Sequence, residues 1–153
     1  MKILLTGATG YIGQRLLPVL LQEGHEVVCC VRDKRRFNMD DYTQQKVSVV
    51  EVNFLNKSTL ENIPEDIDAA YYLVHSMAGG WAGFMERDRQ AATNFVNAAT
   101  SANVRRVIYL GGLGETGAGL SEHLQSRLEV GEILRAAPFA TTFLRAAIIF
   151  GAG

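Results

Sequence analysis

The sequence predicts one α/β domain built on a doubly wound parallel sheet with helices on both faces. The first observation is the length of 153 residues, which suits a single domain over residues 1–153. The second is that short apolar runs alternate with longer stretches of helical periodicity, the pattern of repeated βαβ units. The third is that the 15 glycines gather after apolar runs, where the strands of open α/β sheets end and bind ligands.

Six apolar runs are the predicted strands. They lie at residues 2–6, 27–31, 47–52, 69–74, 106–111 and 141–149. Residues 34–45, between the second and third runs, are polar and are expected to form mostly a loop with one short turn of helix at most.

Helical periodicity predicts three long helices, at residues 11–23, 83–101 and 122–136. Pro18 is expected to kink the first helix or to remove one of its hydrogen bonds. Asp88 is a carboxylate on an otherwise apolar stripe of the second, expected either to be buried beside a base or to face solvent. Ser121 is the predicted N-cap of the third, and Ser58 that of a shorter helix that ends before Pro64. The inward face of the third helix is expected to carry Leu124, Leu128, Gly131 and Leu134.

Composition excludes several classes of protein. The net charge is −1, whereas a general nucleic-acid or membrane-surface binder needs a basic excess. No apolar run approaches the roughly 18–20 residues of a membrane span, and Gly7 comes too early for a signal peptide. Cys29 and Cys30 are adjacent in an apolar run, which indicates buried, reduced thiols. Three dispersed His and these two Cys make no metal site, so we expect a cytoplasmic domain without a metal.

A glycine-rich loop follows the first predicted strand and opens the first helix, with the sequence T-G-A-T-G-Y-I-G over residues 6–13. Three glycines in this context permit a tight turn, close approach of a pyrophosphate, and helix–strand packing. The free amides of the helix N-terminus then face the anion. The sequence therefore predicts a Rossmann-type dinucleotide site. Its candidate residues here are Gly7, Thr9, Gly10, Tyr11, Ile12 and Gly13.

This loop resembles the T-G-A-T-G-x-x-G loop of the short-chain dehydrogenase/reductase superfamily, in particular its extended and atypical branches. Residues 71–77, 109–113 and 144–147 are also similar to NAD(P)-binding, nucleoside-diphosphate-sugar epimerase-like proteins of the NAD-dependent epimerase/dehydratase or NmrA-like type. In the extended branch the substrate-binding part lies mostly after the sixth strand. The resemblance therefore implies that the chain is the cofactor half of a longer protein.

The choice between NAD and NADP depends on the end of the second strand. An acidic residue there accepts the ribose 2′-hydroxyl of NAD, whereas an arginine suits the 2′-phosphate of NADP. The chain has Arg32 first, then Asp33 and three further basic residues, which favours NADP. The alternative is a solvated loop in which Asp33 binds NAD. The resemblance places Asn53 and Phe54 beside the adenine.

Catalytic positions depart from the superfamily pattern of Tyr-x-x-x-Lys with a Ser on the preceding strand. His123 and Arg127 occupy the Tyr and Lys places, and Gly112 stands at the Ser place. In one interpretation His123 is the general acid/base and Arg127 holds the nicotinamide ribose, beside Val74 and His75 at the end of the fourth strand. In the other, hydride chemistry is lost and the fold binds NADP as a sensor or as a structural ligand.

Two functions therefore remain open. The first is an oxidoreductase or epimerase-like enzyme that transfers hydride between nicotinamide and a small-molecule carbonyl or alcohol. The second is a non-enzymatic NADP-binding redox sensor or assembly factor. A small-molecule substrate is the expected partner, with no nucleic acid and no membrane, and the resemblance also allows a homodimer. Trp81 and Phe84 are expected either to cover the cofactor or to pack in the core.

Overall fold

The computed structural model describes residues 1–39, 42, 46–75, 83–113, 121–147, 149 and 151. In this part of the chain one sheet of six parallel strands has the order β3-β2-β1-β4-β5-β6, which confirms the doubly wound α/β fold. The strands are β1 (Lys2–Thr6), β2 (Glu26–Val31), β3 (Val47–Glu51), β4 (Ala69–Tyr72), β5 (Arg106–Gly112) and β6 (Ala140–Ala146). The order reverses between β1 and β4, so the carboxyl ends of these two strands form the switch point at which such sheets bind ligands.

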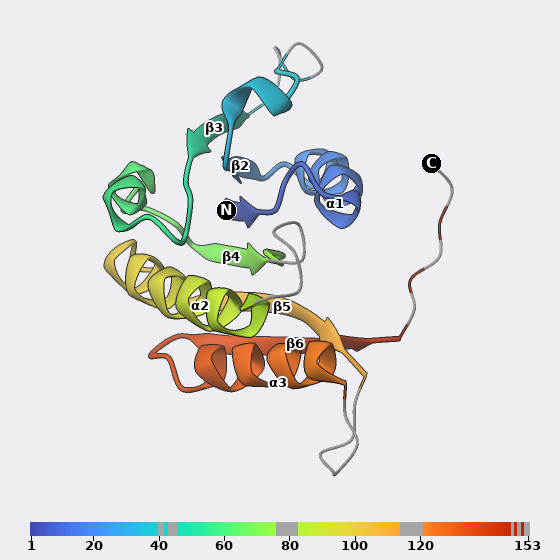
Figure 1. Cartoon of the computed structure of the whole chain (residues 1–153). Coiled ribbons are helices and arrows are strands. Elements are labelled where there is room, and N and C mark those ends of the chain that lie inside the picture. The colour runs from blue at the N-terminus through green and yellow to red at the C-terminus, as the bar shows by residue number, and fades with distance from the viewer. Residues whose placement is uncertain are drawn as a thin grey trace.

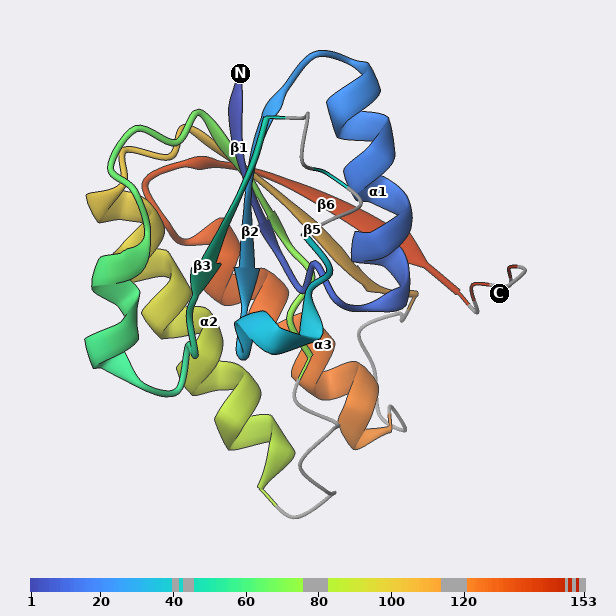
Figure 2. The same cartoon turned by 90° about the horizontal axis from the view of Figure 1, so that it is seen from above.

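Helices cover both faces of the sheet. They are α1 (Tyr11–Gln22), α2 (Phe84–Ser101) and α3 (Glu122–Arg135), with short 3-10 helices η1 (Lys34–Arg36) and η3 (Lys57–Asn62). Figure 2 shows α1 on one face and α2 with α3 on the other, and Figure 1 shows α2 and α3 side by side. This division follows from right-handed crossovers that run in opposite directions from the switch point. None of the described helices is long and apolar enough to cross a bilayer.

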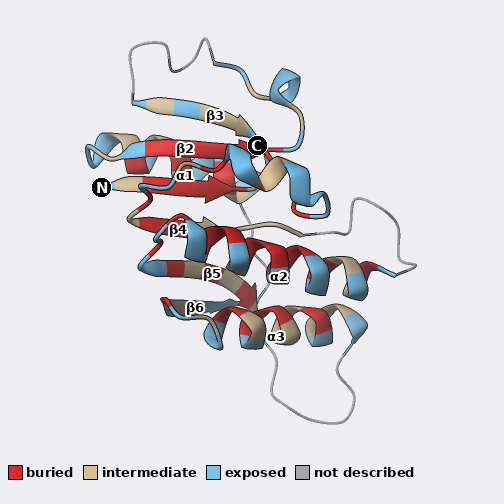
Figure 3. Ribbon diagram, turned by 90° about the vertical axis from the view of Figure 1, so that its left-hand side faces the viewer, coloured by how far each residue is buried: buried red, intermediate tan, exposed pale blue. Residues whose placement is uncertain are grey.

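Two apolar clusters, one on each face, hold these layers together. In β2, Val28 and Cys30 pack on the face of α2 and α3, whereas Val27 and Cys29 pack toward α1. The central strands β1 and β2 are therefore buried along most of their length, as Figure 3 shows. Both cysteines are free and buried, as the sequence predicts, and burial raises the pKa of the Cys29 thiol to about 12.

Three details differ from the sequence predictions. The cap of η3 is Asn56 rather than Ser58, because the Asn56 side-chain oxygen accepts the backbone N–H of Ser58 at 3.2 Å. In α3, Ser126 and Val130 are buried, whereas Leu124 and Leu128 are only half-buried. Strand β4 ends at Tyr72 and β6 at Ala146, earlier than expected. The helix α1 continues through Pro18, which has no N–H to donate to the turn before it.

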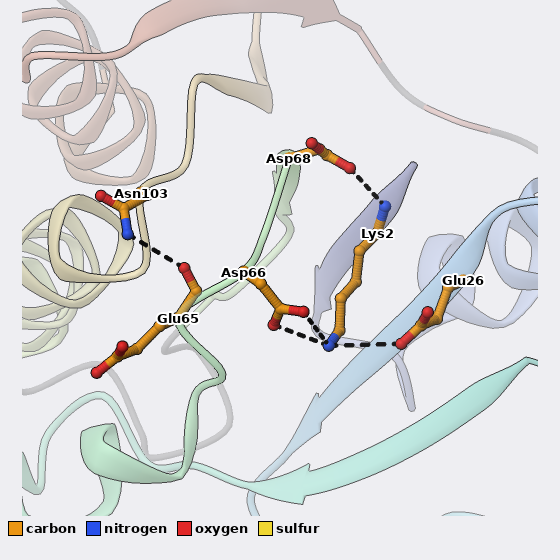
Figure 4. A network of polar contacts seen from close by, with 6 residues as sticks. All are labelled: Lys2, Glu26, Glu65, Asp66, Asp68 and Asn103. Atoms are coloured by element: carbon orange, nitrogen blue, oxygen red, sulfur yellow. Dashed lines mark hydrogen bonds and ion pairs between the residues drawn. The ribbon is translucent and has the colours of Figure 1, made fainter.

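A network of charged residues lies at the amino ends of the strands, opposite the switch point (Figure 4). The Lys2 ammonium lies 2.8 Å from an Asp66 oxygen and 3.5 Å from Glu26, and the Lys2 backbone N–H donates to Asp68 at 2.8 Å. The hydrogen bond to Asp66 raises the pKa of Lys2. These contacts join β1, β2 and the segment before β4. Because these ion pairs are exposed to solvent, each contributes little to stability, and we assign the network no part in the candidate site.

Candidate nucleotide-binding site

The turn after β1 requires glycine at its first position. Gly7 has φ +67°, and a Cβ there would lie 2.8 Å from the carbonyl oxygen of Leu73. The turn is closed by a hydrogen bond of 2.9 Å from the Gly10 N–H to the Gly7 carbonyl. A side chain at Gly7 would therefore both strain the backbone and clash with the segment after β4.

The loop leads directly into α1 and leaves its first amides available. A Cβ at Gly13 would meet the Gly7 carbonyl and come within 2.8 Å of the Ala8 Cα, so glycine lets α1 begin against the loop. Gly10 is the N-cap residue without a side-chain cap, and the Gln14 N–H is the donor to its carbonyl at 2.9 Å. The N–H groups of the first helical residues precede this bond and have no intrahelical acceptor, which is the geometry of an anion site.

A cavity of about 360 Å³ opens beside this loop, at the carboxyl ends of β1, β2 and β4. Sequence-predicted residues in its wall are Gly7, Thr9, Gly10, Arg32, Asn53, Phe54, Val74 and His75. Tyr11, Ile12, Gly13, His123 and Arg127 do not line it. The hydroxyl of Tyr11 instead approaches Gly151, and the Arg15 guanidinium lies 3.6 Å from the centre of the Tyr11 ring.

The sequence interpretation missed part of the cavity wall. Additional lining residues are Cys30, Val31, Val52, Leu55, Leu73, Arg87 and Ala91. Most of these are next to predicted residues at the ends of strands, so the predicted strand ends could have identified them as cavity residues. Arg87 and Ala91 come from α2, and only the packing of that helix against the sheet brings them to the cavity.

At the end of β2 the two candidate ribose-binding residues differ in their surroundings. Asp33 accepts from the Arg35 side chain at 2.9 and 2.8 Å and from its backbone N–H at 3.0 Å. The hydrogen bond with Arg35 lowers the pKa of Asp33, so this carboxylate is ionised and already engaged. Arg32 is exposed at the cavity wall.

The two residues expected beside the adenine also differ. The Phe54 ring is buried in the core at 5.6 Å from the centre of the Phe95 ring, and its carbonyl accepts from Asn94 Nδ2 at 2.6 Å. Asn53 folds its side-chain oxygen back onto the Leu55 N–H at 3.0 Å. Phe54 therefore supports the cavity wall from behind, and its ring is not free to stack on a base.

The rings of two histidines that are distant in the sequence lie close together, tilted by 40° to each other. His75 follows β4 and His123 lies on α3, with ring centroids 5.0 Å apart. The Nδ1 atom of each ring is buried and has no hydrogen-bond partner among the described residues. Burial lowers the pKa of His123, helped by the nearby His75 and Arg127 and opposed by Asp88.

Asp88 of α2 lies beneath this pair. Its side chain is buried, and its Oδ2 accepts from Ser126 Oγ at 2.9 Å and lies 3.7 Å from His75 Nδ1. Of the two outcomes that the sequence left open for Asp88, the structure shows the buried one. Burial, reinforced by the Asp88 charge, raises the pKa of the neighbouring Tyr72.

Arg127 joins the ends of β4 and β5. Its guanidinium donates to the Leu110 carbonyl at 3.1 Å and to the Val74 carbonyl at 3.5 Å. The arginine thus lies at the same sheet edge as His123. At the Ser place, a Cβ on Gly112 would approach the Leu124 side chain at 2.9 Å.

The remaining candidates add no further site. Phe84 is buried in the core, and Trp81 lies outside the described residues. Within the described segments, no group of three or more His, Cys, Asp or Glu side chains is arranged to hold a metal ion.

Comparisons with known proteins agree with this geometry. Photosystem II assembly factor Ycf39 from Synechocystis sp. is 25% identical over 109 residues, which are 71% of this chain and 33% of that protein. Cinnamoyl-CoA reductase 1 from Petunia hybrida is 24% identical over 117 residues, 73% of this chain and 35% of that protein. The chain therefore spans about a third of the length of these curated relatives.

Solved structures support the fold. A nucleoside-diphosphate-sugar epimerase from Staphylococcus aureus superposes with a TM-score of 0.76 at 21% identity, over 95% of this chain and 50% of that one. This likeness confirms the Rossmann-type architecture that the resemblance implies. The model of the family described as NAD(P)H-binding matches residues 7–149. From the glycine loop, the cavity at the switch point and this match, we conclude that the chain belongs to the NAD(P)H-binding family.

Proposed function

We propose that this domain binds NADP and serves an enzyme that exchanges hydride between the nicotinamide and a small-molecule carbonyl or alcohol. The observation that carries the proposal is the 360 Å³ cavity, which joins the glycine loop to the histidine pair through His75. One end of the cavity suits a diphosphate, and the wall of the other contains His75, whose ring lies 5.0 Å from that of His123. A dinucleotide is the ligand class that needs both ends.

Diphosphate binding is assigned to the loop and the first turn of α1. Gly7 and Gly10 line the cavity without side chains, so a pyrophosphate can approach the backbone closely. The first turn of α1 carries no acidic residue that would repel an anion. The positive end of the helix dipole adds about 0.3–1 kcal/mol toward a bound anion.

Preference for NADP over NAD is assigned to Arg32. Its guanidinium lies at the cavity wall, where it can meet a 2′-phosphate with paired hydrogen bonds. Asp33, the residue that would otherwise accept the ribose hydroxyl of NAD, is held by Arg35 in two side-chain hydrogen bonds. Together with the bond from the Arg35 backbone N–H, these bonds occupy three of the roughly four acceptor sites of the carboxylate.

Proton transfer is assigned to His123. The bound nicotinamide supplies or accepts the hydride. Since burial and Arg127 lower the pKa of His123, its neutral form dominates near neutral pH and can accept a proton from an alcohol. Arg127 contributes a permanent positive charge at the ends of β4 and β5, where its backbone contacts hold it in place.

A second candidate function is a non-enzymatic assembly factor. The observation that favours it is the 25% identity to a photosystem II assembly factor over 71% of this chain. In that case the cavity would hold a nucleotide whose state controls a partner protein. Loss of the superfamily Tyr and Lys, with His123 and Arg127 in their places, suits this alternative as well.

Calorimetric titration with NADPH and NADH, followed by a search for hydride transfer, tests the proposal. We expect NADPH to bind more tightly, and we expect consumption of bound NADPH with a carbonyl pool to slow in His123→Ala. Binding without any turnover in the full-length protein would favour the assembly factor. Absence of binding by either dinucleotide would overturn both candidates.

A further inference from the structure

The buried carboxylate of Asp88 requires partners. An ionised carboxylate removed from water loses several kcal/mol of solvation, which hydrogen bonds and nearby positive or polar groups must offset. Ser126 Oγ donates to Oδ2 at 2.9 Å, and the same oxygen faces His75 Nδ1 at 3.7 Å. Asp88 therefore links α2 to α3 and to the segment that follows β4.

The imidazole nitrogens that face this region lack hydrogen bonds. His75 Nδ1 and His123 Nδ1 are both buried without a hydrogen-bond partner in the described part of the chain. A buried donor or acceptor that is left unpaired destabilises the folded state. Of these two atoms, His75 Nδ1 faces the Asp88 carboxylate at 3.7 Å, and the same histidine lines the cavity.

We propose that Asp88 is a positioning residue that holds the His75 ring with its Nδ1–H toward the carboxylate, so that His75 and His123 act as one proton-transfer pair. A carboxylate beside one ring nitrogen selects the tautomer that carries its proton on that nitrogen. The Nε2 atom of His75 is then the one left for exchange. Among the described residues, the charged groups that act on the pair are Asp88 on α2 and Arg127 on α3.

In catalysis this pair would supply the substrate proton, a use that rests on the proposed function above. When an imidazolium gives its proton to a substrate oxygen, an N–H bond breaks and an O–H bond forms. The second imidazole, or water behind it, returns a proton to the first ring. Asp88 keeps its charge throughout and acts only through His75.

The test is the tautomer of His75, measured by long-range proton–nitrogen NMR on the whole chain without added ligand. The chain has three histidines, so spectra of His25→Gln, His75→Gln and His123→Gln assign every ring. We expect neutral His75 to carry its proton on Nδ1. In Asp88→Asn we expect this signal to be lost in favour of Nε2–H, and the His123 titration midpoint to shift to lower pH because Asp88 raises its pKa.

A charge-matched control is Asp66→Asn. It also removes one carboxylate, but at the opposite sheet edge beside Lys2, and we expect it to leave the His75 tautomer unchanged. A wild-type His75 that carries its proton on Nε2 overturns the inference, as does an Asp88→Asn variant with the wild-type tautomer. If Asp88→Asn fails to fold, the wild-type tautomer alone decides.

An NADPH titration of the same sample separates this inference from the proposed function. Absence of dinucleotide binding together with an Nδ1–H tautomer would defeat the proposed function and leave the role of Asp88 standing. Binding together with an Nε2–H tautomer would defeat the role of Asp88 alone.

Discussion

Ser126 Oγ donates a 2.9 Å hydrogen bond to Asp88 Oδ2, and both side chains are buried between α2 and α3. This contact joins α2 and α3 through two residues that are 38 positions apart in the chain. It also explains why α3 turns a polar residue inward. Further along the same helix, Gly131 admits the Phe143 ring of β6, which a Cβ would approach at 2.8 Å.

Replacement of Ser126 by Ala should destabilise the domain. The buried Asp88 carboxylate loses one hydroxyl donor, and a hydrogen bond to a charged group contributes about 1.5–3 kcal/mol. Urea unfolding of the variant and of the wild type measures the difference. Ser101→Ala, at the exposed end of α2, is the control and should change the free energy of unfolding by less than about 0.5 kcal/mol. Equal stability of Ser126→Ala and wild type would show that this hydrogen bond contributes nothing net.

Replacement of Gly7 by Ala should remove dinucleotide binding. The added Cβ would meet the Leu73 carbonyl oxygen at 2.8 Å and displace the loop that approaches the pyrophosphate. We expect affinity for NADPH to fall at least about tenfold, or about 1.4 kcal/mol, in a calorimetric titration.

Gly24→Ala is the matched control for that change. Gly24 also has positive φ, at +78°, but nothing lies within 4 Å of an added Cβ, and the residue does not line the cavity. It should lose roughly 1–2 kcal/mol of stability through backbone strain and keep its NADPH affinity. Comparable losses of affinity in both glycine variants would mean that strain, and not the loop, accounts for the effect.

Replacement of Arg32 by Ala should weaken NADPH binding and spare NADH binding. Hydrogen bonds to a charged group contribute about 1.5–3 kcal/mol, so we expect about a 10- to 100-fold loss for NADPH. Arg106→Ala, an exposed arginine on β5 beside the opposite edge of the sheet, should leave both affinities in place. Parallel losses for NADPH and NADH in Arg32→Ala would contradict a contact with the 2′-phosphate.

Acid should destabilise the domain through His123. Because the folded state lowers the pKa of His123 below its ordinary value of 6.5, the unfolded chain takes up a proton first as the pH falls. The contribution of the neutral His123 ring to the stability of the fold is therefore present above about pH 6.5. It is lost as the pH falls toward the pKa of His123 in the folded state. Urea unfolding between about pH 7.5 and about pH 5.5 should show a smaller pH dependence in His123→Gln than in wild type. An identical dependence in the two proteins would refute this assignment.

The sequence alone determined the strands, the long helices and the glycine loop. These features depend on neighbours in the chain. A short apolar run predicts a strand, and Gly7, Gly10 and Gly13 lie within a few residues of one another in a single turn. The apolar stripe of α2 follows in the same way from its helical spacing, and the structure buries its Ala91, Ala92, Phe95 and Ala99. For Asp88, however, spacing could not decide between solvent and a partner.

Only the tertiary structure decided what the carboxyl edge of the sheet brings together. Asp88, Ser126, His75 and His123 come from three separate segments, and no local pattern encodes their distances. The burial of the Phe54 ring likewise depends on how α2 packs, because the Phe95 ring of that helix lies 5.6 Å from it. Hydrophobic periodicity determines which face of a helix or strand is buried. The contacts made on that face depend on how α2 and α3 pack against the sheet.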